Sequence, residues 1–325
     1  MLSYRNLLKK TWNISLKNKY LWVFGLFASL AATSGSIEYQ ILSKNLSRNL
    51  VDGSYLQLNN ILSLGDLMQG LGAGLSILFI QDPWIILNAL TLIIVSITLI
   101  VSFVWLAISS QVALVDHVKK ILGPKKKTHI LSIQEGLTIG NKKFWPVLGL
   151  NVLIKIAVSL VFFIISIPLL FMLLSNTTGL IVTYLILFVF LVPVAVSLAL
   201  MIKYAIAYNV LENESFLASL EKGWKLFIKN WLVSLEMAVM LFIINFLFGI
   251  AALIVISVLF FPLFLIGAMF NMIWLSILML LFGILVVILL GSFLTTFQTA
   301  TWTTLFVELN KKKGTAKLER LFQRK

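Results

Sequence analysis

Residues 3–18 read SYRNLLKKTWNISLKN, and residues 215–230 read SFLASLEKGWKLFIKN. Seven positions recur at the same spacing; six are identical, and the seventh exchanges Tyr4 for Phe216. The identical pairs are Ser3–Ser215, Leu8–Leu220, Lys10–Lys222, Trp12–Trp224, Lys17–Lys229 and Asn18–Asn230. A weaker copy runs from Ile130 to Trp145, and an apolar run follows each copy. The repetition predicts a membrane protein built from three similar hairpins.

The composition is that of an integral membrane protein. Of 325 residues, 60% are hydrophobic and only 12% are charged, and the mean hydropathy is +1.02. Soluble domains carry about 25% charged residues, so the charge here is too sparse for a surface that faces only water. The chain has no cysteine. Disulfides, cysteine-based metal sites and a thiol nucleophile are therefore excluded.

Stretches without charge predict six membrane-spanning helices, because about 20 apolar residues cross a bilayer core of about 30 Å. The expected spans are 20–37, 83–115, 145–174, 179–205, 231–259 and 272–304. A break between the last two is expected from Phe261-Pro262 to Asn271. The predicted fold class is an all-α membrane bundle of six transmembrane helices in three repeated hairpins. An amphipathic interfacial helix is expected before each hairpin.

Lysine and arginine predict the orientation. Of 26 basic residues, 22 lie in the N-terminal arm, the 116–143 and 212–229 connections and the 311–325 tail. These segments alternate onto one face, which the positive-inside rule places in the cytoplasm together with both termini. We therefore expect a multi-pass protein of the cell membrane. Its net charge of +14 favours anionic lipid over nucleic acid as partner, because the basic residues flank the spans.

The ends of the even-numbered spans define the expected repeat units. Asp116, Glu212 and Glu308 follow these spans and are 96 residues apart. The spacing predicts units near 3–120, 128–212 and 214–310 within one six-span domain over residues 1–310. A basic cytoplasmic tail follows at 311–325. The long 37–82 connection breaks the symmetry and is expected on the outer face.

The repeated segments are predicted to contact the lipid interface. In 215–229 the apolar residues fall on one helical face and the lysines on the other, a pattern typical of a helix lying among lipid headgroups. The candidate interface residues are Trp12, Lys17, Trp22, Lys143, Trp145, Trp224, Lys229 and Trp231. The alternative is a linker helix packed under the bundle.

Three ionisable residues form a candidate polar site near the membrane: Lys155, Glu236 and Lys203. A charge at the bilayer centre costs about 3 kcal/mol or more, so Lys155 needs a partner, water or neutrality. One interpretation is a polar site in the bundle, in which Lys155 faces Glu236 and moves ions or protons. The alternatives are a buried pair without transport and a lysine that reaches the interface along a tilted helix.

The repeated unit resembles a family of prokaryotic membrane proteins related to the membrane domain of glycerophosphoryl diester phosphodiesterases. The matching stretches are Leu7–Trp22, Gln134–Trp145 and Ala218–Trp231. In that family the phosphodiesterase chemistry belongs to a separate soluble domain. The resemblance therefore implies the six-span membrane module alone, without catalytic residues to carry over.

The chain shows no pattern of residues that indicates catalysis. His117 and His129 lack the carboxylates of a zinc site, and no HExxH or GxxxxGK[ST] motif is present. We expect a non-enzymatic protein without cofactor or metal, a membrane-organising or lipid-associated scaffold or accessory protein. The alternative is a small permease or a lipid or ion transporter around Lys155 and Glu236. A membrane enzyme acting on lipid headgroups has only the family resemblance in its favour.

Overall fold

The structure is a computed structural model that describes residues 4–29, 83–123, 132–175, 180–270 and 272–311. Helices make up 94% of these residues, and none of them lies in a strand. The predicted all-α class is thus confirmed for the described part of the chain. The chain divides into two units, one of residues 1–29 and 107–325 and one of residues 30–106. All contacts described below lie within the first unit.

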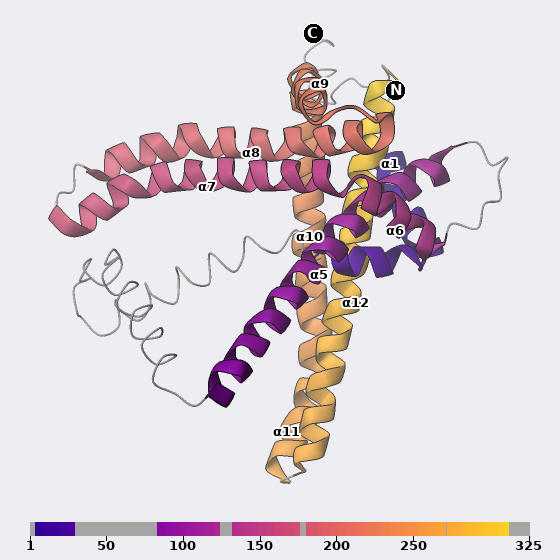
Figure 1. Cartoon of the computed structure of the whole chain (residues 1–325), viewed down its shortest axis with the longest axis vertical. Coiled ribbons are helices and arrows are strands. Elements are labelled where there is room, and N and C mark those ends of the chain that lie inside the picture. Colours follow the sequence, from indigo (N-terminus) through magenta and orange to yellow (C-terminus); the bar gives the residue numbers. More distant parts are fainter. Residues whose placement is uncertain (1–3, 30–82, 124–131, 176–179, 271, 312–325) are drawn as a thin grey trace. The chain divides into compact units, whose positions relative to one another are not determined.

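The helices follow the expected order along the chain (Figure 1). They are α1 (Tyr4–Lys17), α5 (Pro83–Leu122), α6 (Ile133–Lys142), α7 (Phe144–Ser175), α8 (Leu180–Glu212), α9 (Phe216–Lys229), α10 (Trp231–Leu259), α11 (Phe261–Met269) and α12 (Ile273–Asn310). Residues 21–29 are also helical. Each of the short helices α1, α6 and α9 thus precedes the start of a longer apolar segment.

Among the described residues, five segments are long and apolar enough to cross a membrane, so the chain is a multi-pass membrane protein. They are Leu90–Leu122, Phe144–Pro168, Ile181–Glu212, Trp231–Gly267 and Ile273–Asn310. These segments correspond to the second through sixth expected spans. The first expected span is described only as far as Ser29. The 37–82 connection and the tail beyond Lys311 lie outside the described residues.

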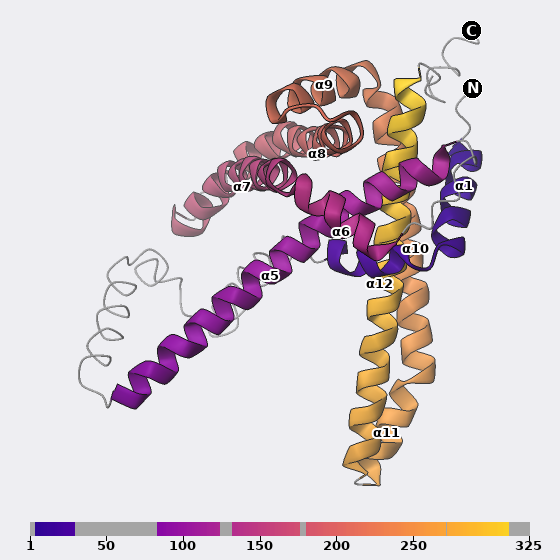
Figure 2. The same ribbon diagram turned by 45° about the vertical axis from the view of Figure 1, so that its right-hand side comes forward.

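Two antiparallel helix pairs are seen in both ribbon views (Figure 1, Figure 2). In the first, α7 packs on α8 through Val161, Ile165 and Ala195. In the second, α10 and α11 run against α12, where Gln298 Nε2 donates to Asn245 Oδ1 at 2.8 Å.

The break expected at 261–271 is shorter than predicted. Residues 261–269 form α11, and α12 begins at Ile273. Pro262 is compatible with this helix because it lies in the first turn, where the missing N–H has no helical partner to lose.

Three long helices form the second, fourth and sixth expected spans, namely α5, α8 and α12, and each is longer than a bilayer core requires. The 38 residues of α12 extend about 57 Å, against about 30 Å of hydrocarbon. No residue from 273 to 291 is buried, whereas buried side chains recur from Ser292 to Leu309. The exposed apolar part measures about 28 Å, close to the hydrocarbon thickness. The C-terminal half of α12 therefore packs against other helices, and α8 likewise continues beyond the expected end at residue 205.

The C-terminal ends of these helices pack with the short helices. We call this assembly, formed by α1, α6, α9 and the C-terminal parts of α5, α8 and α12, the collar. Tyr208 on α8 meets Phe306 on α12 edge to face, with ring centroids 4.8 Å apart. Lys119 Nζ on α5 donates to the Leu211 carbonyl oxygen on α8 at 2.7 Å. The collar thus ties the ends of the three long helices together.

Candidate functional site: the collar of short helices

Helix α9 packs closely on α8 because it presents small residues to that helix. Ser219 and Gly223 are buried, and a Cβ added to Gly223 would lie 2.9 Å from the Ala205 backbone nitrogen. Ser215 begins the helix as its N-cap, accepting from the Ala218 N–H at 3.4 Å. The glycine therefore sets how near the two backbones lie.

Helix α6 meets α5 in the same way, through a glycine in each of two successive turns. A Cβ on Gly140 would lie 2.6 Å from the Ser109 carbonyl oxygen. A Cβ on Gly136 would lie 2.5 Å from Phe24 Cζ and 3.0 Å from His117 Cε1. Side chains larger than hydrogen do not fit at either position without displacing neighbours.

Helix α1 packs on the last hairpin through polar and aromatic contacts. Thr11 and Thr301 place their hydroxyl oxygens 3.1 Å apart. Trp12 meets Phe293 edge to face, with centroids 4.9 Å apart. The Tyr4 hydroxyl donates to the Glu236 carboxylate on α10. The start of the chain is thereby attached to both α10 and α12.

These three attachments occupy corresponding positions in the sequence. Ser109, Ala205 and Thr301 each lie seven residues before the acidic residues that are 96 residues apart. Their partners Gly140, Gly223 and Thr11 each lie eight residues after a serine, namely Ser132, Ser215 and Ser3. Helix α6 packs on α5 and α9 packs on α8, in each case a long helix that precedes it in the chain, and α1 packs on α12.

The outward faces of α1 and α9 carry matching exposed residues. Trp12 is 37% exposed and Leu16 44% exposed, and the corresponding Trp224 and Ile228 are 44% and 52% exposed. An exposed lysine follows in each helix, Lys17 in α1 and Lys229 in α9. In both helices an aliphatic residue and a lysine therefore face away from the collar beside a partly exposed tryptophan, and Trp12 also contacts Phe293 with one edge of its ring.

The remaining candidate interface residues divide by exposure. Trp145 and Trp231, near the starts of α7 and α10, are 76% and 55% exposed. Lys143 is half-buried. Trp22 is also half-buried, and its indole nitrogen donates to the Ser15 carbonyl oxygen at 2.8 Å. Trp22 therefore has a role inside the collar that the sequence pattern did not indicate.

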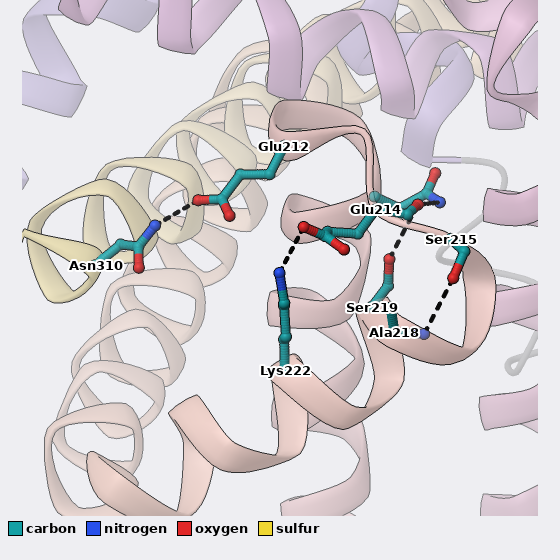
Figure 3. Close-up of polar contacts among 8 residues, drawn as sticks. Glu212, Glu214, Ser215, Ala218, Ser219, Lys222 and Asn310 are labelled. Carbon is teal, nitrogen blue, oxygen red and sulfur yellow. Dashed lines mark hydrogen bonds and ion pairs between the residues drawn. The ribbon is translucent and has the colours of Figure 1, made fainter.

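Ion pairs engage two of the three lysines of α9. Lys222 Nζ lies 2.5 Å from Glu214, and Lys225 Nζ lies 2.5 Å from Glu221. The bond from Glu214 raises the pKa of Lys222 above its ordinary value. The bond from Lys225 lowers the pKa of Glu221. Figure 3 shows the first pair beside the turn between α8 and α9.

The candidate polar site is spread over three helices. Lys155 is exposed on α7, and Glu236 is half-buried on α10, where it receives the Tyr4 hydrogen bond. Lys203 is exposed on α8, with Nζ 5.7 Å from the centroid of the Trp302 ring, a cation–π distance. Tyr4 is a partner for Glu236 that the sequence did not predict. The expected pairing of Lys155 with Glu236 stays a prediction.

His117 lies fully buried where α5, α6 and residues 20–24 meet. Its ring packs edge to face against Tyr20 and Phe24, with centroids 5.9 Å and 5.5 Å away. Neither ring nitrogen has a hydrogen-bond partner in the described part of the chain. The Tyr20 hydroxyl also has none there. No group of three or more His, Cys, Asp or Glu that could hold a metal occurs among the described residues.

Sequence reasoning missed the residues that attach the collar. Ser109, Ala205 and Thr301 share the 96-residue spacing of the acidic residues. This spacing alone does not show that they are contact positions, because the helices that pack on them must also be known. Comparison with known protein families, with curated proteins and with solved structures finds no match to this chain.

Proposed function

We propose that this protein is a non-enzymatic scaffold of the cell membrane that holds lipid at one bilayer face through α1 and α9. The matching outward triplets support this most directly: Trp12, Leu16 and Lys17 on α1, and Trp224, Ile228 and Lys229 on α9. Tryptophan and aliphatic side chains enter the headgroup layer while lysine contacts lipid phosphate.

The collar supplies the rigidity that such a role needs. The inner face of α9 is fixed on α8 by Ser219 and Gly223, so its outer face cannot turn inward to bury Trp224 and Ile228. The inner face of α1 is fixed on α12 through Thr11. Exposed apolar side chains on a fixed surface favour a stable contact, and a bilayer interface satisfies them.

Three repeated hairpins, six spans and cytoplasmic termini belong to the same proposal. The corresponding contacts of Gly140, Gly223 and Thr11 support the repeat. The helical residues 21–29 support a first span. The excess of basic residues in the segments that contain α1, α6 and α9 supports a cytoplasmic collar.

Site-directed spin labelling of the full chain in nanodiscs tests the lipid contact. The chain has no native cysteine, so a single introduced cysteine reports one position. A label at Ile228→Cys is expected to be accessible to oxygen, which partitions into lipid, and shielded from a water-soluble nickel complex. A label at Lys222→Cys, on the lysine side of α9, is expected to show the opposite accessibility. If both labels are equally open to the nickel complex, α9 lies off the bilayer and the proposal is wrong.

A further inference from the structure

Helix α1 carries a surface of uncompensated positive charge. Its exposed basic residues are Arg5, Lys9, Lys10 and Lys17, and the helix contains no acidic residue. None of the four forms an ion pair with a carboxylate within the described ranges of the chain. Four cations against no carboxylate leave a charge of +4 on α1.

Helix α9 differs in this respect, although its Trp and aliphatic residues match those of α1. Lys222 is paired with Glu214 and Lys225 with Glu221, which leaves Lys229. Three lysines against two carboxylates give +1 for α9 and the turn before it. The two helices therefore present similar apolar surfaces to a bilayer but very different charges.

The outward direction of the α1 cations is fixed by the opposite face of the helix. Tyr4, Leu7, Thr11, Ile14 and Ser15 are buried. Thr11 meets Thr301, and Trp12 packs against Phe293 at the edge of the exposed face. The basic residues and Leu16 thus remain on the accessible side while the helix is attached to α12.

We propose that the outward face of α1 is the main binding surface for anionic phospholipid headgroups, whereas α9 contacts the bilayer with a much weaker preference for headgroup charge. The inference rests on the proposed lipid contact of both helices and assigns the charge selectivity to one of them. Each basic residue near an anionic surface strengthens binding about fivefold at low salt. A +4 helix is therefore expected to concentrate anionic lipid around itself, and a +1 helix much less.

Fluorescence quenching at two matched positions tests this assignment. Leu16→Cys and Ile228→Cys place the same dye at corresponding sites on the full chain in nanodiscs of zwitterionic and anionic lipid. A spin label is carried either by the anionic lipid or by the zwitterionic lipid. At low salt the dye at position 16 is expected to be quenched severalfold more by the anionic lipid. The dye at position 228 is expected to show a much smaller preference for the anionic lipid.

Salt and charge variants separate attraction by charge from other causes. At 1 M salt the screening length is about 3 Å. The ratio of quenching by anionic lipid to quenching by zwitterionic lipid at position 16 is then expected to fall towards one. The high-salt measurement needs no further substitution in α1. Combining Arg5→Gln, Lys9→Gln, Lys10→Gln and Lys17→Gln should abolish the preference, and the control pair Lys222→Gln and Lys225→Gln on α9 should leave it unchanged. Inorganic phosphate at constant ionic strength should also leave it unchanged, because the ligand is the bilayer surface.

The outcomes distinguish this inference from the proposed function. An anionic preference that is equal at both positions, or that is lost in the α9 variant, overturns the assignment to α1 and leaves the lipid contact intact. Quenching at both positions without any charge preference does the same. Absence of quenching at both positions by either lipid contradicts the proposed function itself.

Discussion

Thr11 and Thr301 hold their hydroxyl oxygens 3.1 Å apart, although 290 residues separate them along the chain. Both side chains are fully buried. Ser292 and Thr296 of α12 also donate to the carbonyl oxygens of Trp22 and Leu21, just after α1. The beginning of the chain is therefore part of the last hairpin, and that hairpin is complete only when α1 has packed on it.

A disulfide is expected to form between positions 11 and 301. The double variant Thr11→Cys and Thr301→Cys places two sulfur atoms where the hydroxyl oxygens now meet, and the chain has no other cysteine to compete. Mild oxidation in the membrane should give a product with altered mobility on non-reducing electrophoresis that reverts on reduction.

The matched control for the disulfide is Thr11→Cys with Ala205→Cys. Ala205 is the position on α8 that corresponds to Thr301, but its contact is Gly223 of α9. This pair should remain reduced under the same conditions. Efficient cross-linking of the control, or none in the first pair, would show that α1 is not attached specifically to α12.

Gly223 is expected to tolerate no side chain. In Gly223→Ala the new Cβ would lie 2.9 Å from the Ala205 nitrogen and 3.1 Å from its Cα, and backbone atoms cannot rotate away. Crowding of this kind costs about 1–3 kcal/mol. We expect a lower thermal unfolding midpoint in detergent and faster amide exchange in residues 216–229.

Gly249→Ala serves as the control for the glycine substitution. Gly249 lies within α10, and nothing lies within 4 Å of an added Cβ. The substitution should be neutral or stabilising by up to about 1 kcal/mol, because alanine favours a helix more than glycine does. Equal effects of the two substitutions would contradict the close approach of α9 to α8.

The spans could be predicted from the sequence because a bilayer imposes length and polarity directly on the chain. The expected 145–174 and 231–259 compare with 144–175 for α7 and 231–259 for α10. The C-terminal ends of α5, α8 and α12 could not be predicted in the same way. Helix α8 continues past the expected end at residue 205 to Glu212, where α9 packs on it, and contacts between separate helices leave no mark on hydropathy.

The candidate sites likewise combine local features, which the sequence predicts, with contacts between distant segments, which it does not predict. Trp145, Trp224 and Trp231 are exposed, and their contact with the lipid interface stays a prediction. Tyr4, the partner of Glu236, lies 232 residues away, and no spacing rule joins the two. The resemblance to the membrane domain of glycerophosphoryl diester phosphodiesterases stays a prediction.

Asn213 is expected to be replaceable by glycine but not by valine. Its φ of 57° lies in the left-handed region, where it ends α8 and lets Glu214 turn back (Figure 3). In this turn Asn209 Nδ2 donates to the Glu214 carbonyl oxygen at 2.8 Å. Asn213→Gly should retain stability, whereas Asn213→Val should cost about 1–2 kcal/mol. The measurements are the thermal midpoint and amide exchange at residues 213–222, and equal exchange in both variants would speak against the turn.

The ion pairs of α9 are expected to persist from mildly acidic to mildly basic pH. The pKa of Lys222 is raised, so its contribution to stability is present below about pH 10 and disappears as the pH rises through the folded-state value. The pKa of Glu221 is lowered, so its contribution is present above about pH 4 and disappears as the pH falls through its folded-state value. Amide protection of residues 214–225, corrected for intrinsic exchange, should be flat between these limits. A change near neutral pH would contradict this assignment.

Replacing the unpartnered polar groups around His117 is expected to stabilise the collar. A buried polar atom without a hydrogen bond costs about 1–3 kcal/mol, and the Tyr20 hydroxyl and both His117 nitrogens are of this kind in the described structure. Tyr20→Phe removes one such group without adding volume and should raise the thermal midpoint.

His117→Phe removes two unpartnered nitrogens but adds volume beside Gly136, where the ring is already closely packed. Its gain should therefore be smaller than the two nitrogens alone suggest, whereas Tyr20→Phe carries no such penalty. The two rings are 5.9 Å apart, so the double variant also measures their coupling. If Tyr20→Phe lowers the midpoint, the hydroxyl has a partner in the folded protein and the site is not a source of instability.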